Sequence, residues 1–130
     1  MRPSRLEVMK EISIGAVRYR IPATERDGQW IARAERTDTG HRFGIECAGA
    51  SPDDAVGCVE RWLAWQHEHV AALEDLQRAE RAYHRTIAGS AFANPTERPS
   101  AIEMQKESLE AVEAARIRLD EIRARRPESP

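Results

Sequence analysis

The stretch that decides the fold is residues 59–87, VERWLAWQHEHVAALEDLQRAERAYHRTI. Its large apolar residues recur at steps of three, four and seven: Val59, Leu63, Val70, Leu73, Leu76, Tyr83 and Ile87. This spacing places them along one narrow stripe of an α-helix. Such a stripe is typical of a helix that packs against a partner helix.

The chain supplies that partner itself. A second stripe follows in residues 100–126, at Ile102, Leu109, Val112, Leu119 and Ile122. Between the stripes lies the loop 89–99, GSAFANPTERP, whose two prolines and one glycine exclude a continuous helix. The sequence therefore predicts an antiparallel, coiled-coil-like two-helix hairpin over residues 65–126, followed by a tail at 127–130. Folding back about the loop sets Leu76 opposite Val112 and Val70 opposite Leu119.

Both helices have start signals. Ser51 is a good N-cap, Pro52 suits the first helical position, and Asp53 and Asp54 favour the positive end of the helix dipole. Ser100 with Glu103 forms a capping-box pattern for the second helix. Gly57, inside the first helix, costs about 1 kcal/mol relative to alanine. We expect a close approach of helix to sheet there.

Residues 11–64 predict a ββ(β)α module. Ile12, Ile14, Val17, Tyr19 and Ile21 are spaced as in a half-buried strand. Asp27-Gly28 is a strong signal for a type I′ hairpin turn, and a second turn falls at residues 37–40. The expected fold is α+β: a three-stranded antiparallel meander packed on the start of the long helix. Residues 1–10 are expected to be a mobile N-terminus.

Residues 17–64 resemble the HicB-like half-domain, the ββ(β)α unit of certain antitoxins. The similar elements are the first strand, the entry into the second strand at 27–32 (DGQWIA) and the helix entry at 48–56 (AGASPDDAV). The resemblance implies a small protein-binding or dimerising module. The helical hairpin is not part of that pattern, since the family typically continues into another strand or a DNA-binding segment. This departure after Leu63 argues against both toxin neutralisation and DNA binding.

Composition narrows the functional class. The chain has 130 residues, a net charge of -2 and 32% charged residues, so its bulk charge points to neither nucleic acid nor membrane. It has no apolar run near the length of a membrane span, and its first residues lack a secretion signal. We therefore expect a cytoplasmic protein. Cys47 and Cys58 are expected to be reduced and to pack near one another as small apolar residues, with a disulfide as the alternative.

No catalytic or metal-binding pattern emerges. The sequence has no nucleophile-elbow, phosphate-loop or metalloprotease motif. His67 and His69 point in nearly opposite directions on a helix, so they cannot share an ion locally. The sequence thus predicts a non-enzymatic protein–protein interaction or assembly module without cofactor or metal, possible tasks being regulation or inhibition by occlusion.

Five residues are candidates for binding a protein partner. They are Trp65 at the junction of sheet and hairpin, Phe92 and Asn94 at the hairpin tip, and Arg125 and Arg126 at the end of the second helix. Phe92 either folds back over the hairpin end or anchors a partner. A second apolar flank, which includes Ala82, Met104 and Ile117, predicts a homodimer through the hairpin.

The alternative function is a nucleic-acid-associated regulator, antitoxin-like or transcription-related. It would use the basic end of the second helix, where Arg116, Arg118 and Arg123 precede Arg125 and Arg126. Acidic residues interrupt this patch, at Glu110, Glu113, Asp120 and Glu121. A solvated helix face explains that pattern better than a phosphate-binding surface does. Nucleic acid is therefore not the favoured partner, and no membrane partner is expected.

Overall fold

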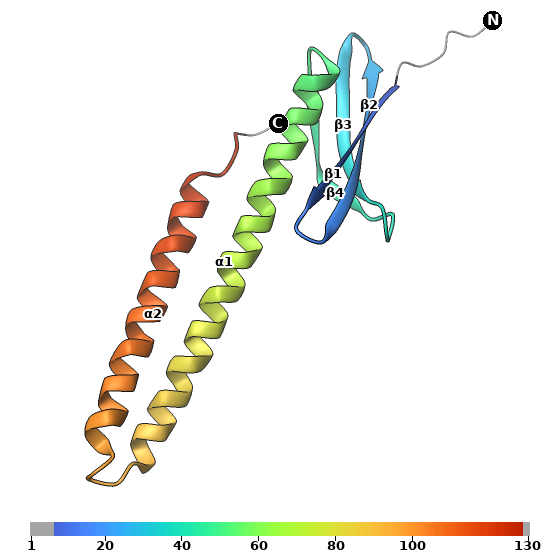
Figure 1. The fold of residues 1–130 in the computed structure, drawn as a ribbon. Coiled ribbons are helices and arrows are strands. Elements are labelled where there is room, and N and C mark those ends of the chain that lie inside the picture. Colours follow the sequence, from blue (N-terminus) through green and yellow to red (C-terminus); the bar gives the residue numbers. More distant parts are fainter. Residues whose placement is uncertain (1–6, 129–130) are drawn as a thin grey trace, which may run out of the picture. The chain divides into compact units, whose positions relative to one another are not determined.

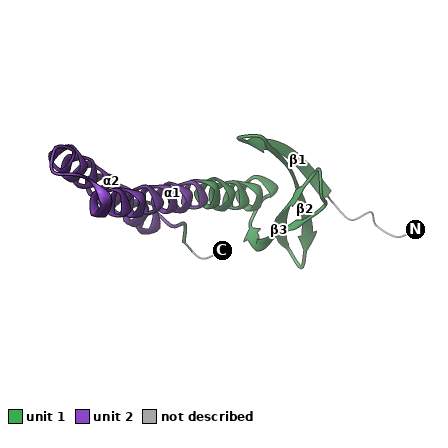
Figure 2. Ribbon diagram, turned by 90° about the horizontal axis from the view of Figure 1, so that it is seen from below, with its two compact units in different colours: residues 1–67, 127–130 green, residues 68–126 purple. Residues whose placement is uncertain are grey.

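The computed structural model describes residues 7–128 and has the α+β class expected from the sequence (Figure 1). Four strands precede two helices: β1 (Glu7–Ile14), β2 (Val17–Arg26), β3 (Gln29–Arg36), β4 (Arg42–Gly49), α1 (Pro52–Phe92) and α2 (Arg98–Ala124). The chain divides into two compact units, residues 1–67 with 127–130, and residues 68–126 (Figure 2). The long helix α1 contributes to both, and each unit is described by itself.

The expectation of three strands is wrong, because the sheet has four. The apolar alternation over residues 12–21 belongs to two strands, β1 and β2, which pair antiparallel from Glu7 opposite Thr24 to Ile14 opposite Val17. A tight turn joins them at Gly15, which has a φ of 58°. The step of three residues between Ile14 and Val17 breaks the two-residue period and marks this turn.

The expected mobile N-terminus is also wrong for residues 7–10, which belong to β1. Lys10 Nζ in this strand lies 2.6 Å from Glu60 Oε1 on α1. Residues 1–6 of that expected segment, and residues 129–130 of the expected tail, lie outside the described residues.

The sheet has the order β1-β2-β3-β4, with every neighbouring pair antiparallel. The turn predicted at Asp27-Gly28 is confirmed, since the two residues have φ angles of 53° and 82°. Both values lie in the left-handed region that a type I′ turn requires.

The core of the first unit lies between one face of the sheet and the start of α1. Its buried residues are Tyr19, Ile21, Ala23, Ala32, Ala34 and Cys47 from the strands and Ala55, Val56, Val59, Trp62 and Leu63 from α1. The helical members are those expected to pack on the sheet. Burying these apolar side chains is the main stabilising contribution to this unit.

The start of α1 follows its sequence signal. Ser51 Oγ accepts a hydrogen bond from the backbone N of Asp54 at 3.1 Å, which confirms Ser51 as the N-cap. The close approach of helix and sheet falls at Gly49 instead of Gly57. A Cβ atom at Gly49 would lie 2.7 Å from the backbone N of Ala55, whereas one at Gly57 would meet only Arg61 Nη1 at 3.5 Å.

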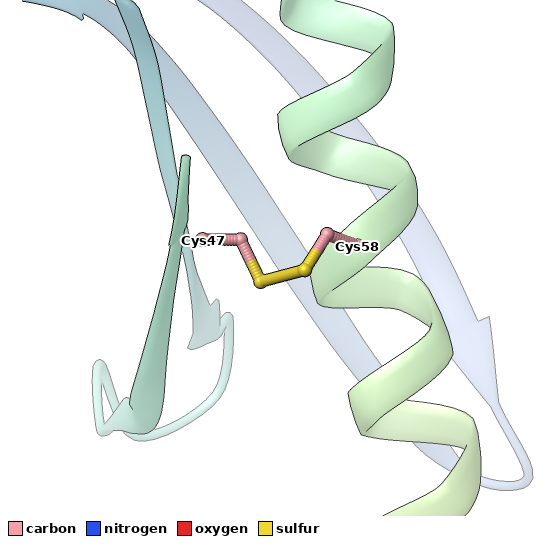
Figure 3. Close-up of a disulfide and its surroundings, with 2 residues drawn as sticks. All are labelled: Cys47 and Cys58. Carbon is pink, nitrogen blue, oxygen red and sulfur yellow. A yellow bond between two sulfur atoms is a disulfide. The ribbon is translucent and has the colours of Figure 1, made fainter. Parts of the chain in front are cut away.

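A disulfide joins β4 to α1 between Cys47 and Cys58, whose Cα atoms are 6.0 Å apart (Figure 3). The sequence placed the two residues near each other correctly. The expectation of two reduced thiols is wrong, because the sulfur atoms are bonded. Packing of β4 against the first two turns of α1 brings the side chains within bonding reach.

In the second unit, α2 runs back antiparallel to the C-terminal part of α1 (Figure 1). The loop between them is shorter than the expected 89–99, because α1 continues through Gly89 to Phe92. The second helix begins at Arg98, with Glu97 at the N-cap position and no side-chain cap. Ser100 lies inside α2 and does not cap it, so the expected capping box is wrong.

The longer first helix moves the turn along the chain and shifts the register by about one helical turn. Extended along the helices, the expected register sets Arg118 opposite Ala71 and Ser90 opposite Pro99. In the structure Arg118 Nη1 lies 3.7 Å from Asp75 Oδ2. Ser90 Oγ donates hydrogen bonds to Ala101 O at 3.4 Å and to Gln105 Oε1 at 3.2 Å. In each case the observed partner lies further along the chain than the partner that the expected register gives.

Candidate protein interface

The seam between the hairpin helices has a heptad spacing on α2. Its partly or fully buried positions are Ala101, Gln105, Ser108, Val112, Ala115, Leu119 and Ile122. Val112, Leu119 and Ile122 are the buried ones, and they lie far from the tip. Towards the tip the seam residues are small or polar. The large apolar side chains of that region are therefore outside the seam.

Seven large apolar side chains of this unit are exposed: Val70, Ile87, Phe92, Ile102, Met104, Leu109 and Ile117. Four of them (Val70, Ile87, Ile102 and Leu109) were expected in the seam, and that expectation is wrong. The one-turn shift in register explains the difference, since smaller residues take their places between the helices. The hairpin thus carries an apolar surface that it does not itself cover.

Two sides of the tip carry these residues. Met104 lines a pocket together with Ala82 and Gly89 of α1. Ile102 is two residues from Met104, and a step of two turns a helical side chain by about 200°. Ile102 therefore lies on the side of α2 opposite to Met104, and Leu109, seven residues further on, lies on the same stripe as Ile102.

The pocket has a volume of about 580 Å³. Small or apolar residues make up much of its lining, including Ala82, Gly89, Ala101 and Met104, and its two charged lining residues are Arg85 and Glu97. The predicted second flank contained Ala82 and Met104, and the structure brings both to this pocket. No sequence signal marks Arg85 and Glu97 as site residues, because the loop that places Glu97 beside α1 has no distinctive motif.

At the tip, Phe92 is the last residue of α1 and is 89% exposed. It therefore does not fold back over the hairpin end. Asn94 organises the turn: its Oδ1 accepts hydrogen bonds from Thr96 Oγ1 at 2.8 Å and from the backbone N of Glu97 at 2.9 Å. These contacts assign Asn94 a structural role in holding the start of α2.

Trp65 lies in the first unit, where it is partly buried against the core. Its ring meets that of Trp62 edge-on, with centroids 6.0 Å apart and planes at 79°. This geometry is favourable for aromatic pairs. Trp65 is therefore engaged in packing within its own unit and is separate from the exposed apolar residues of the tip.

The arginines near the end of α2 contact α1. Arg125 Nη2 lies 3.5 Å from Glu68 Oε2, and Arg123 Nε donates to His69 Nε2 at 3.4 Å. Exposed pairs of this kind contribute about 0–1 kcal/mol each. Arg126 is exposed at the same end of the helix. The basic residues are thus partly occupied by partners within the hairpin.

Neither a metal site nor a membrane span is found within residues 7–128. No group of three or more His, Cys, Asp or Glu residues in this range is placed to hold a metal ion. No helix in the same range is long and apolar enough to cross a membrane.

Comparison with protein-family models, with curated proteins and with solved structures gave no match.

Proposed function

We propose that this protein is a non-enzymatic assembly module whose helical hairpin binds another protein chain. The observation that carries the proposal is the set of large apolar side chains that the hairpin leaves exposed, among them Phe92, Ile102 and Met104 near the tip. Scattered apolar residues are ordinary on a surface, but a concentration of them on one element is typical of an interface.

The partner that fits this surface is helical. The seam of α2 already has heptad spacing, and apolar side chains flank it near the tip. Added helices could pack on these flanks as in a four-helix, coiled-coil-like arrangement. A second copy of the chain is one such partner, and a larger protein regulated or inhibited by occlusion is another. A dimerising or protein-binding role is also what the HicB-like resemblance of residues 17–64 implies.

Site-specific photo-crosslinking tests this proposal. A photoreactive amino acid replaces Ile102, and a matched variant carries it at Arg81, an exposed polar position on α1. In cells that express the variants, the photoreactive residue at position 102 should give a defined adduct with the partner, identified by mass spectrometry. Untagged copies of the unmodified protein should compete for the partner and suppress this adduct. Arg81 should give much less. Equal or absent adducts at both positions would overturn the proposal.

The alternative is binding to nucleic acid through the arginines at the end of α2. The ion pair between Arg125 and Glu68 leaves less free positive charge there than the sequence suggests. Electrophoretic mobility with duplex DNA over a salt series tests this role, because a phosphate binder weakens steeply as salt rises. A steep dependence that Arg125→Glu abolishes would favour nucleic acid over protein as the partner.

The compartment is part of the same proposal. The sequence favours the cytoplasm, but a disulfide between Cys47 and Cys58 is more typical of an oxidising compartment. We propose that the protein is cytoplasmic. The disulfide persists there because Cys47 is fully buried and shielded from exchange with external thiols.

A further inference from the structure

We propose that two copies of this chain associate tip to tip, with Phe92 of each copy inserted into the tip pocket of the other. This inference rests on the proposed function and names the partner and the contact. The tip carries an exposed apolar knob and an apolar pocket, so one surface is complementary to itself. A self-complementary patch is what a two-fold symmetric dimer requires.

The knob is Phe92. Its side chain is 89% exposed although it is the largest apolar group of the tip. It lies three residues, less than one turn, beyond Gly89, which lines the pocket. The knob and the pocket are therefore neighbours on the same end of the hairpin. Aromatic anchors of this kind supply much of the binding energy in protein interfaces.

The receptor is the pocket of about 580 Å³. Pockets of about 300–1,000 Å³ hold small organic ligands, so this one has room for a phenyl ring. Its lining includes Ala82 and Ala101, whose small side chains leave the space open, and Gly89, which has no side chain. Met104, which also lines it, is 59% exposed. Methionine adapts its shape and makes favourable sulfur contacts with aromatic rings.

Charge complementarity selects a second copy as the occupant. Arg85 and Glu97 both line the pocket, and within residues 7–128 neither side chain forms an ion pair. In a two-fold dimer each Arg85 can meet Glu97 of the other copy, and the contact occurs twice. The pocket thus presents one charge of each sign, as a self-recognising surface does.

Sedimentation or light scattering over a micromolar concentration series tests the inference. The mass should rise from 14.7 kDa towards twice that value. Phe92→Ala should weaken association by at least about tenfold, the effect of truncating an interface anchor. Met9→Ala serves as the control, because Met9 is also a large, exposed apolar side chain but belongs to β1, outside the hairpin. It should leave the association unchanged.

A charge swap gives the second readout. Arg85→Glu and Glu97→Arg should each weaken the dimer, whereas the double variant should recover association, because the pair is restored with reversed signs. Helix circular dichroism shows that each variant remains folded. A chain that stays monomeric throughout, or a dimer unaffected by Phe92→Ala, would overturn tip docking. In either case a competed adduct from Ile102 would still support the proposed function, so the two failures are distinguishable.

Discussion

Tyr19 Oη lies 2.8 Å from His67 Nε2, and the two rings meet edge-on with their centroids 5.8 Å apart. The two side chains share one hydrogen bond, whose donor is set by the tautomer of the imidazole. The contact joins the start of β2 to the last residue of α1 that belongs to the first unit. Burial raises the pKa of the Tyr19 phenol, an effect that the positive charge of Arg36 opposes.

Tyr19→Phe should lower the free energy of unfolding by about 1 kcal/mol near neutral pH, because it removes this hydrogen bond. It should also change the alkaline limb of the stability profile. The folded pKa lies above the ordinary 10.0, so above that pH the unfolded chain loses the Tyr19 proton first. Above that pH the free energy of unfolding therefore falls as pH rises. Tyr19→Phe removes the part of this decline that Tyr19 causes.

Urea unfolding at neutral pH and on the alkaline side of the tyrosine range measures both effects. A variant whose stability declines with pH as steeply as that of the parent would show that Tyr19 ionises equally in the folded and unfolded states.

The disulfide should stabilise the first unit. Cys47 and Cys58 are 11 residues apart, and closing a loop of that size lowers the entropy of the unfolded chain by an amount worth about 3 kcal/mol. Reduction of the wild type should therefore lower the denaturant midpoint of the first unit. The Cys47→Ala, Cys58→Ala double variant is the control, since a reducing agent should not affect it. Thiol titration that finds two free thiols in the unreduced folded protein would contradict the assignment.

Local signals predicted most of the first unit. Ser51 caps α1 and Asp27-Gly28 forms the turn, because short-range hydrogen bonding and φ preference decide both features. The sequence pattern did not reveal β1 as a separate strand, because residues 7–10 have no sustained apolar period of their own. Their place in β1 depends on pairing with β2, a contact between residues distant in sequence.

The hairpin was predictable as a pair of helices but its tip was not. Apolar periodicity gave both stripes, but the register depends on where α1 ends. Gly89 is a common stop signal, but here the helix continues to Phe92 because glycine inside a helix costs only about 1 kcal/mol. That extension moved Ile102 out of the seam and formed the pocket at Met104. Of the candidate residues, Phe92 was placed on an exposed tip, while Asn94 proved to hold the turn.

Gly49→Ala should destabilise the first unit by about 1–3 kcal/mol, as overpacking of a tight contact does. The new methyl group would lie 2.8 Å from Asp54 Cβ and 2.7 Å from the backbone N of Ala55, so the start of α1 must move. Gly44→Ala, on the same strand, meets no atom within 4 Å and is the matched control. Gly57→Ala should stabilise by up to about 1 kcal/mol through helix propensity.

Thermal unfolding of the three glycine variants distinguishes close packing from backbone propensity. The order of stability should be Gly57→Ala highest, Gly44→Ala near the parent and Gly49→Ala lowest. If Gly57→Ala were instead the most damaging substitution, the close approach would be at Gly57 and the helix would sit differently on the sheet.

Two leucines of α2 test the observed seam. Leu119 is 4% exposed and Leu109 is 38% exposed, although the apolar pattern of the sequence places both in the seam. Leu119→Ala should cost about 2–5 kcal/mol, since it leaves a cavity between the helices, whereas Leu109→Ala should cost less than about 1 kcal/mol. Both changes have the same difference in helix propensity, so burial alone separates them. Native-state hydrogen exchange of α2 amides, measured at a concentration where the chain is monomeric, reports the local loss of stability in each variant. Equal losses at the two positions would restore the expected register, in which both leucines lie between the helices.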